Sequence, residues 1–181
     1  VPRYLPSLLS GFSAAHPDIA VDFVEGDQRR IVDSLMTGET ELALSYNLDL
    51  PTSVTAAPLV DLPPYAIVHR RHRFAARKHL ARRQLAEDPV ILLDMPISRE
   101  YYASIFSLLN IRPNIRHRST SVEAVRGLVA NGLGYSILNH RSRSRMAFDG
   151  QRIVELDIDD RLPPAQVSML MPAGVKSRRI V

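Results

Sequence analysis

The stretch that most constrains the fold of this chain is Ser119–Asn139, which reads STSVEAVRGLVANGLGYSILN. Thr120 opens a T-x-x-E sequence, the spacing of a capping box at the start of a helix. The pair Asn131-Gly132 then predicts a left-handed helix end, and the apolar run Tyr135–Leu138 predicts a short buried strand. The apolar residues at helical spacing between these signals are Val122, Val125, Leu128 and Val129. A helix, a glycine stop and a strand in this order form half of a parallel α/β unit.

An earlier stretch, Glu25–Asn47, repeats the same order of signals with almost no shared residues. A polar start leads into an apolar helical face, Gly38 ends the helix, and Leu42–Tyr46 follows as a predicted strand. The predicted helical face consists of Ile31, Val32, Leu35 and Met36. The recurrence predicts two α/β lobes with similar local organisation, although a single α/β domain would also show this order several times.

The remaining elements follow from apolar periodicity and from the positions of proline and glycine. Three further helices are predicted, at Tyr4–Ala15 with Leu5, Leu8, Leu9 and Phe12 facing inward, at Ser98–Leu109 with Ser98 as N-cap, and at Ser142–Ala147. Further strands are predicted at Ile19–Glu25, Val54–Leu59, Tyr65–His69, Val90–Leu93, Ile115–Arg118, Ile153–Ile158 and Gln166–Met171. Asp149-Gly150 is predicted to form a turn. The alternation of helices and strands is that of an α/β protein.

Composition excludes several classes of protein. No apolar run approaches the ~20 residues of a membrane-spanning helix, so no membrane partner is expected. The absence of cysteine excludes disulfides, thiol catalysis and cysteine-bound zinc, and it suits a cytoplasmic protein. The net charge of +4 is concentrated in two runs, at positions 69–83 and 140–145. Both runs lack interleaved aromatic residues beyond Phe74, which favours a solvated surface over direct DNA contact.

The sequence contains no recognisable catalytic or metal-binding constellation. There is no G-x-S-x-G nucleophile motif and no pair of carboxylates at a suggestive spacing. His69 and His72 lie among arginines, whose positive charge would repel a metal cation. We therefore expect neither an enzyme nor a bound cofactor.

Polar residues at predicted helix starts are the remaining candidates for binding. In parallel α/β sheets such starts lie at the carboxyl ends of strands, where ligands bind, and their amide groups favour an anion. The relevant residues are Asp27-Gln28, Ser98-Arg99 and Ser119-Thr120-Ser121. Helix capping alone is the alternative explanation for each of them.

Several short motifs, taken in order, resemble the effector-binding domain of LysR-type transcriptional regulators over nearly the whole chain. The motifs are His16-Pro17-Asp18, Glu25-Gly26, Gly38-x-x-Glu41-Leu42-Ala43, Val129-Ala130-x-Gly132-x-Gly134, and a DG turn before RIVEL. The resemblance implies two periplasmic-binding-protein-like (type 2) lobes joined by two crossing strands. Lobe one would comprise residues 1–67 and 162–181, and lobe two residues 68–161.

The resemblance also implies segments outside this chain. The first strand of lobe one and an N-terminal winged helix-turn-helix would precede Val1, and the carboxyl-terminal helix would be cut near Val181. DNA would then be bound through the missing N-terminal domain. Arg73-Phe74 replaces the usual Pro-Leu, so the crossover there would be longer or looser. A peroxide-sensing member is excluded because cysteine is absent.

The predicted function is that of a ligand-sensing module that controls transcription. The alternatives are a solute-binding protein of a transport system and an enzyme on the same fold. The family implies a homodimer or homotetramer, with contacts through the first helix, at Tyr4 and Ser7, and through the other lobe's helix near Arg126.

The expected effector is a small organic anion, such as a carboxylate or an aromatic acid, held between the lobes. Amides at two helix starts would meet its negative group, and side chains from lobe one would close over it. The predicted effector-binding residues are Gln28, Asn47, Pro96, Ile97, Ser98, Arg99, Thr120, Ser121 and Val122.

Overall fold

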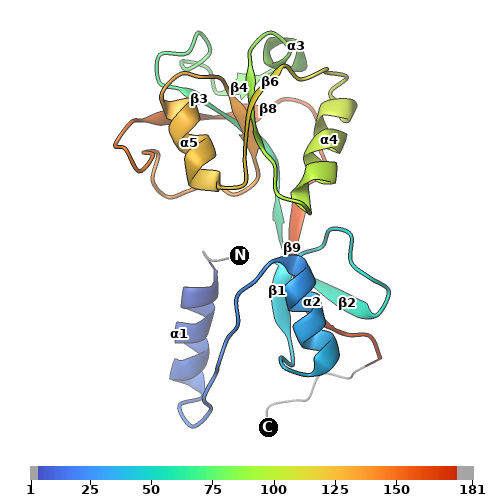
Figure 1. Cartoon of the computed structure of the whole chain (residues 1–181). Coiled ribbons are helices and arrows are strands. Elements are labelled where there is room, and N and C mark those ends of the chain that lie inside the picture. The colour runs from blue at the N-terminus through green and yellow to red at the C-terminus, as the bar shows by residue number, and fades with distance from the viewer. Residues whose placement is uncertain (1–3, 175–181) are drawn as a thin grey trace. The chain divides into compact units, whose positions relative to one another are not determined.

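The structure is a computed structural model that describes residues 4–174. The chain divides into two compact units, one formed by residues 1–61 and 166–181 and the other by residues 62–165. The α/β class predicted from the sequence is confirmed, because both units contain helices as well as strands (Figure 1). The predicted carboxyl-terminal helix near Val181 lies outside the described residues.

The first unit is built around a small mixed core of one helix and one sheet. It contains helices α1 (Leu5–Ala15) and α2 (Gln28–Thr37) and strands β1 (Ala43–Tyr46), β2 (Val54–Leu62) and β9 (Ala165–Pro172), in the sheet order β1-β9-β2. Strand β1 runs antiparallel to β9. The core contains Leu35, Ala43, Val54 and Leu170, with Ile31 and Val32 packed against it. Of the predicted face of α2, Met36 is instead 50% exposed.

The segment between α1 and α2 differs from the prediction. Ile19–Glu25 forms no strand, and the alternating Ile19, Val21 and Phe23 are 39%, 43% and 57% exposed. A strand needs a neighbour to accept and donate its backbone hydrogen bonds, and this segment has none among residues 4–174. Helix α1 likewise has no fully buried residue. Of its predicted inward face, Leu5, Leu9 and Phe12 are half-buried and Leu8 is 50% exposed.

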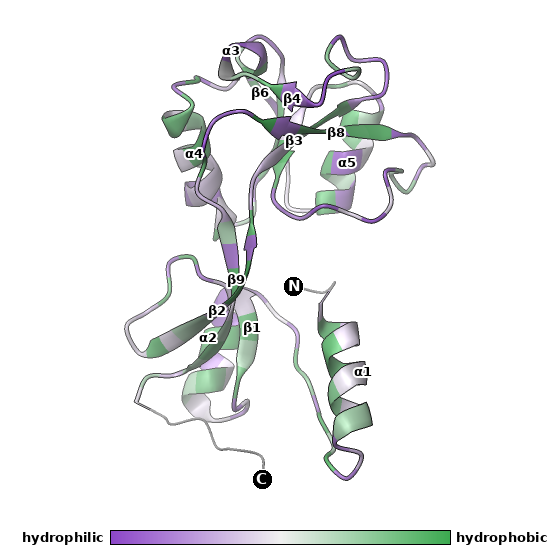
Figure 2. Ribbon diagram, turned by 180° about the vertical axis from the view of Figure 1, so that it is seen from behind, coloured by the Kyte–Doolittle hydropathy of each residue, from purple (hydrophilic) through white to green (hydrophobic). Residues whose placement is uncertain are grey.

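The second unit holds the larger core. Its strands are β3 (Tyr65–His69), β4 (His79–Leu80), β5 (Val90–Leu93), β6 (Ile115–Ser119), β7 (Ser136–Leu138) and β8 (Ile153–Ile158). Its helices are α3 (Arg82–Leu85), α4 (Ser98–Leu108) and α5 (Val122–Ala130). The sheet order is β4-β8-β3-β7, and β5 pairs in parallel with β6 and with Tyr135. Strands β3 and β8 and helix α5 pack together, and Figure 2 shows hydrophobic colour in β8 and both hydrophobic and hydrophilic colour on α5.

Two glycines of the second unit have distinct structural roles. Gly132, at φ +77°, ends α5 in the left-handed turn that the sequence predicted. Gly134 lies where the chain passes close to β5, and a Cβ placed there would be 2.3 Å from the carbonyl oxygen of Pro89. The approach allows the Tyr135 amide to donate to that oxygen at 2.9 Å.

Candidate functional site

Helix α5 begins one residue later than the sequence predicted. Ser121, not Thr120, is the N-cap, and its Oγ accepts a hydrogen bond from the Ala124 amide at 3.3 Å. The predicted capping box is wrong because Glu123 points to another partner, the Nε of Arg126 at 3.2 Å. Thr120 is exposed and lies just before the cap.

The amides at this helix start are only partly available to a ligand. The Ser121 amide donates to the Oγ of Ser119 at 3.1 Å, so it is not free as predicted. The first-turn amides of Val122 and Glu123 have no intrahelical acceptor, as in any α-helix. The capacity of α5 to bind an anion therefore lies at Val122 and Glu123 rather than at Ser121.

The start of α4 does not offer the free backbone amides that an anion would need. Ser98 is not the N-cap, a position held by Ile97 without a side-chain hydrogen bond. The amides of Ser98 and Arg99 both donate to the carbonyl oxygen of Met95, at 3.1 and 3.0 Å. The expectation of free amides at Ser98-Arg99 is therefore wrong.

Arg99 has a partner inside the second unit. Its Nε lies 2.6 Å from one carboxylate oxygen of Asp94, and Arg118 lies 3.2 Å from the other oxygen. The hydrogen bond from Arg99 makes the largest contribution and lowers the pKa of Asp94. The hydrogen bond from Arg118 lowers this pKa further, although partial desolvation of the carboxylate raises it. The carboxylate stays ionised and offsets part of the charge that Arg99 would offer to an anion.

The structure brings the two helix starts of the second unit together. Strands β5 and β6 are parallel neighbours, with Leu93 opposite Ser119, and the Asp94 amide donates to the Ser119 carbonyl oxygen at 2.8 Å. The predicted residues Pro96, Ile97, Ser98 and Arg99 follow β5, whereas Thr120, Ser121 and Val122 follow β6. Both groups thus lie at the carboxyl edge of one parallel pair, the usual position of a ligand site.

The two predicted residues of the first unit are held by hydrogen bonds within that unit. Gln28 is buried, its Nε2 donates to the Leu48 carbonyl oxygen at 2.5 Å, and its Oε1 accepts from Ser45 at 3.3 Å. The Nδ2 of Asn47 donates to the Oε1 of Gln166 at 3.2 Å. Both side chains therefore order their own unit, and only Asn47 is exposed.

A groove of about 580 Å³ lies beside α4 in the second unit. Its lining includes the apolar residues Leu92, Phe106 and Ile111 and the arginines Arg99, Arg112 and Arg118. Of the predicted effector-binding residues, only Arg99 reaches it. Within residues 4–174, no group of three His, Asp or Glu side chains is placed to hold a metal ion.

A buried polar network that the sequence analysis missed connects α4 to both ends of the second unit. The Nδ2 of Asn139 donates to the Leu62 carbonyl oxygen at 2.8 Å and to the Tyr101 hydroxyl at 2.7 Å. The Tyr101 hydroxyl donates to the Pro163 carbonyl oxygen at 2.8 Å. Leu62 and Ala165 are the residues at which the chain enters and leaves this unit. Nothing in the sequence around Asn139 identifies these partners, because they are 38 and 77 residues away along the chain.

We expect the removal of the Asn139 side chain to destabilise the second unit by about 1.5–2.5 kcal/mol, since it removes the donor to the Leu62 carbonyl oxygen and one of the two hydrogen bonds of the Tyr101 hydroxyl. Tyr101→Phe should cost about 1 kcal/mol. Urea unfolding of Asn139→Ala, Tyr101→Phe and the double variant gives a double-mutant cycle. Because the two groups share one hydrogen bond, the double variant should lose less than the sum of the single losses. Additive losses would contradict the network.

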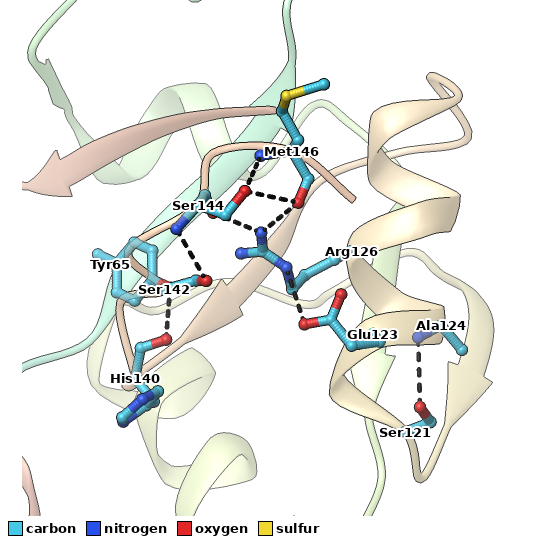
Figure 3. Close-up of polar contacts among 9 residues, drawn as sticks. All are labelled: Tyr65, Ser121, Glu123, Ala124, Arg126, His140, Ser142, Ser144 and Met146. Atoms are coloured by element: carbon cyan, nitrogen blue, oxygen red, sulfur yellow. Dashed lines mark hydrogen bonds and ion pairs between the residues drawn. The ribbon is translucent and has the colours of Figure 1, made fainter. Parts of the chain in front are cut away.

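Arg126 is buried rather than available for a subunit contact. It is 2% exposed, and its Nη2 donates to the carbonyl oxygens of Ser144 and Met146 at 2.7 and 3.0 Å (Figure 3). A dimer contact through the helix near Arg126 stays a prediction, and the buried Arg126 side chain itself would not take part in it. Ser7 is exposed on α1, and Tyr4 is half-buried.

Comparison with known proteins gives the family. The sequence profile of the LysR substrate binding domain matches residues 1–180. The chain belongs to the LysR family of transcriptional regulators. No described helix is long and apolar enough to cross a membrane.

Solved and curated LysR proteins agree with this assignment. HinK, a LysR family transcriptional regulator from Pseudomonas aeruginosa, has a TM-score of 0.92 and 34% identity over 98% of this chain and 62% of its own. The transcriptional regulator CysB of Haemophilus influenzae is 28% identical over 92% of this chain and 52% of its own length. The effector-binding domain of QuiR shares the fold, with a TM-score of 0.80 at 20% identity over 95% of this chain and 82% of its own. The chain spans about half the length of the curated relatives it matches.

Proposed function

We propose that this LysR domain senses a small organic anion and thereby controls transcription by the protein that carries it. The family match over residues 1–180 carries the proposal. The relatives with known names are transcriptional regulators rather than enzymes or transport proteins, so the transport alternative has no support here.

The anionic character of the effector is supported by the edge of the β5–β6 pair. Helix α5 presents the amides of Val122 and Glu123 at this edge, and a helix terminus contributes about 0.3–1 kcal/mol to anion binding. Arg118 lies beside this edge and is 52% exposed while paired with Asp94. The QuiR domain, which has the same fold, was solved with shikimate, a carboxylic acid. An effector acts by binding one conformation of the domain better than another.

The remaining parts of this proposal concern the whole protein. DNA binding belongs to a helix-turn-helix segment outside this chain, as the family resemblance implies. We further propose a homodimer or tetramer in which α1 takes part, because α1 has no buried residue of its own. Contact between lobe-one residues and the effector, including Asn47, stays a prediction from the resemblance.

We expect calorimetric titration with a panel of small carboxylic acids to identify an effector whose affinity falls at least fivefold in the double variant Arg118→Ala, Thr120→Ala, which removes the two exposed side chains at the edge of the β5–β6 pair. Neither side chain caps a helix, so the double variant should leave both helix starts intact. Arg116→Ala, at an exposed position of β6, serves as the matched control. Equal affinity for wild type and double variant would place the effector elsewhere.

A further inference from the structure

The loop formed by residues 140–152 joins β7 to β8 and exposes two large apolar side chains. Phe148 is 89% exposed and Met146 is 53% exposed, whereas Ala147 between them is 5% exposed. Burial of a large apolar side chain is a main source of binding energy. A phenylalanine held almost completely in solvent is therefore available to a partner.

The loop has a defined conformation. Met146 pairs with Arg152 across a short hairpin, and the Gly150 amide donates to the Ala147 carbonyl oxygen at 2.9 Å. Gly150 adopts φ +77°, as the residue after a tight turn requires. Phe148 thus lies at the tip of a turn whose geometry keeps it away from the core.

Two contacts from α5 hold the loop at its base. Buried Arg126 donates to the carbonyl oxygens of Ser144 and Met146, and Figure 3 shows the Met146 side chain pointing away from this anchor. The Nδ2 of Asn131, which follows α5, donates to the Asp149 carboxylate at 2.6 Å. A partner that binds Phe148 would therefore meet a pre-ordered surface, which lowers the entropic cost of binding.

Arginines outnumber acidic residues in this loop, in which Asp149 is the one acid. Arg143, Arg145 and Arg152 are exposed on the loop and form no ion pair among the described residues. Arg70 and Arg71 follow His69, whose neighbour across the sheet is Ile153, the residue after Arg152. Figure 2 shows the chain that follows β3 in the hydrophilic colour. Aromatic residues, methionine and arginine are the types enriched at the energetic centres of protein interfaces.

We propose that the 140–152 loop is a docking surface for an acidic protein segment that carries aromatic or aliphatic side chains. Apolar side chains of the partner would cover Phe148 and Met146, and its carboxylates would pair with Arg143, Arg145 and Arg152. Two such loops facing each other across a two-fold axis would bring six arginines together, so symmetric self-association at this surface is disfavoured. Helix α1 contains no charged residue and offers no complement to the arginines. A DNA backbone would satisfy the arginines but would leave Phe148 in water.

Peptides of 12 residues can be selected from a display library for binding to the purified protein. The affinities of the selected peptides, once synthesised, are then measured by fluorescence anisotropy. We expect the selected peptides to combine two or more Asp or Glu with Phe, Leu or Trp. Phe148→Ser should weaken their binding at least tenfold, and Arg143→Glu with Arg145→Glu should abolish it. Leu108→Ser and Arg116→Glu, exposed positions of the same unit outside the loop, are the matched controls and should bind as wild type does. Because Phe148 makes little contact with the core, Phe148→Ser should retain the wild-type melting temperature.

Other outcomes would overturn the proposal. A selection that yields no binder, or peptides that bind Phe148→Ser as well as wild type, would remove the docking surface. Binding of a peptide with the sequence of residues 18–27, DIAVDFVEGD, together with self-association that depends on Phe148, would assign the surface to a second copy of the chain. Binding of an unrelated 20-base-pair duplex that depends on the arginines but not on Phe148 would assign it to nucleic acid.

Discussion

Gly134→Ala is expected to destabilise the second unit by about 3 kcal/mol or more, enough to unfold it at moderate temperature. The added methyl group would lie 2.3 Å from the Pro89 carbonyl oxygen, and Gly134 adopts φ +155°, which is unfavourable for a residue with a side chain. The Pro89 carbonyl oxygen cannot easily move away, because it accepts a hydrogen bond from the Tyr135 amide. The Tyr135 carbonyl oxygen in turn accepts a hydrogen bond from the Ile91 amide, which fixes the two segments together.

Gly127→Ala is the matched control for this prediction. Gly127 lies inside α5, and a Cβ there would meet nothing within 4 Å. Alanine in a helix interior is favoured over glycine by about 0.5–1 kcal/mol, so this variant should be more stable than wild type. Thermal and urea unfolding measure both changes. A Gly134→Ala variant with wild-type stability would show that the backbone does not approach as closely as described.

Arg126→Ala is expected to cost about 2–4 kcal/mol and to loosen the 140–152 loop. The substitution removes hydrogen bonds from a buried guanidinium to two carbonyl oxygens and leaves a cavity where the side chain packed. Arg126→Met keeps most of the apolar volume and should lose less. Because the Nη1 of Arg126 has no hydrogen-bond partner among the described residues, part of the desolvation cost is already borne by the native protein.

Hydrogen exchange measures the second half of this prediction. The amides of Met146 and Ala147 should exchange faster in Arg126→Ala, whereas those of β3 should keep their relative protection. Arg116→Ala, an exposed position on β6, should change stability by no more than about 0.5 kcal/mol. If Arg126→Ala behaves like Arg116→Ala in both measurements, the buried anchor is not what holds the loop.

The parts of the fold that the sequence predicted well are those determined by local pattern. Tyr65–His69, Val90–Leu93 and Ile153–Ile158 have the predicted bounds. The first two are mainly apolar runs and the third mixes apolar with acidic residues, and both patterns predict strands when turn or proline residues lie nearby. Gly38 ends α2 with φ +73°, as its position after an apolar helical face predicts. Asp149-Gly150 forms the predicted turn.

The wrong predictions depend on partners distant in sequence or on a choice between adjacent residues. Ser142–Ala147 has the composition of a short helix, but the Met146 amide, which a helix would pair with the Ser142 carbonyl oxygen, donates to the Ser144 hydroxyl instead. Thr120 and Ser121 are equivalent as caps by residue type, and only the backbone conformation decides between them. At the start of α4, the Met95 carbonyl oxygen accepts hydrogen bonds from the Ser98 and Arg99 amides, which were predicted to be free. No pattern in the sequence indicates the turn that brings Met95 to these amides.

The sequence predicted the location of the candidate site more accurately than it predicted the charged groups within it. Both helix starts of the second unit do lie at the end of a parallel strand pair, as a general rule of α/β proteins predicts. The carboxylate of Asp94 between Arg99 and Arg118 was not anticipated, because a salt bridge over 24 residues leaves no periodic signal. The Asp94 carboxylate reduces the positive local charge from which we predicted an anionic effector.

The exposed stretch Ile19–Val24 should influence the solubility of the purified domain at high concentration. Its apolar side chains are exposed and it pairs with no strand among residues 4–174, which gives it the character of an open sheet edge and favours aggregation. The interspersed acids Asp18, Asp22 and Glu25 oppose it, as charged residues next to adhesive strands commonly do. Salt that screens these carboxylates should therefore lower solubility, and low ionic strength at neutral pH is the condition of choice for purification and crystallisation.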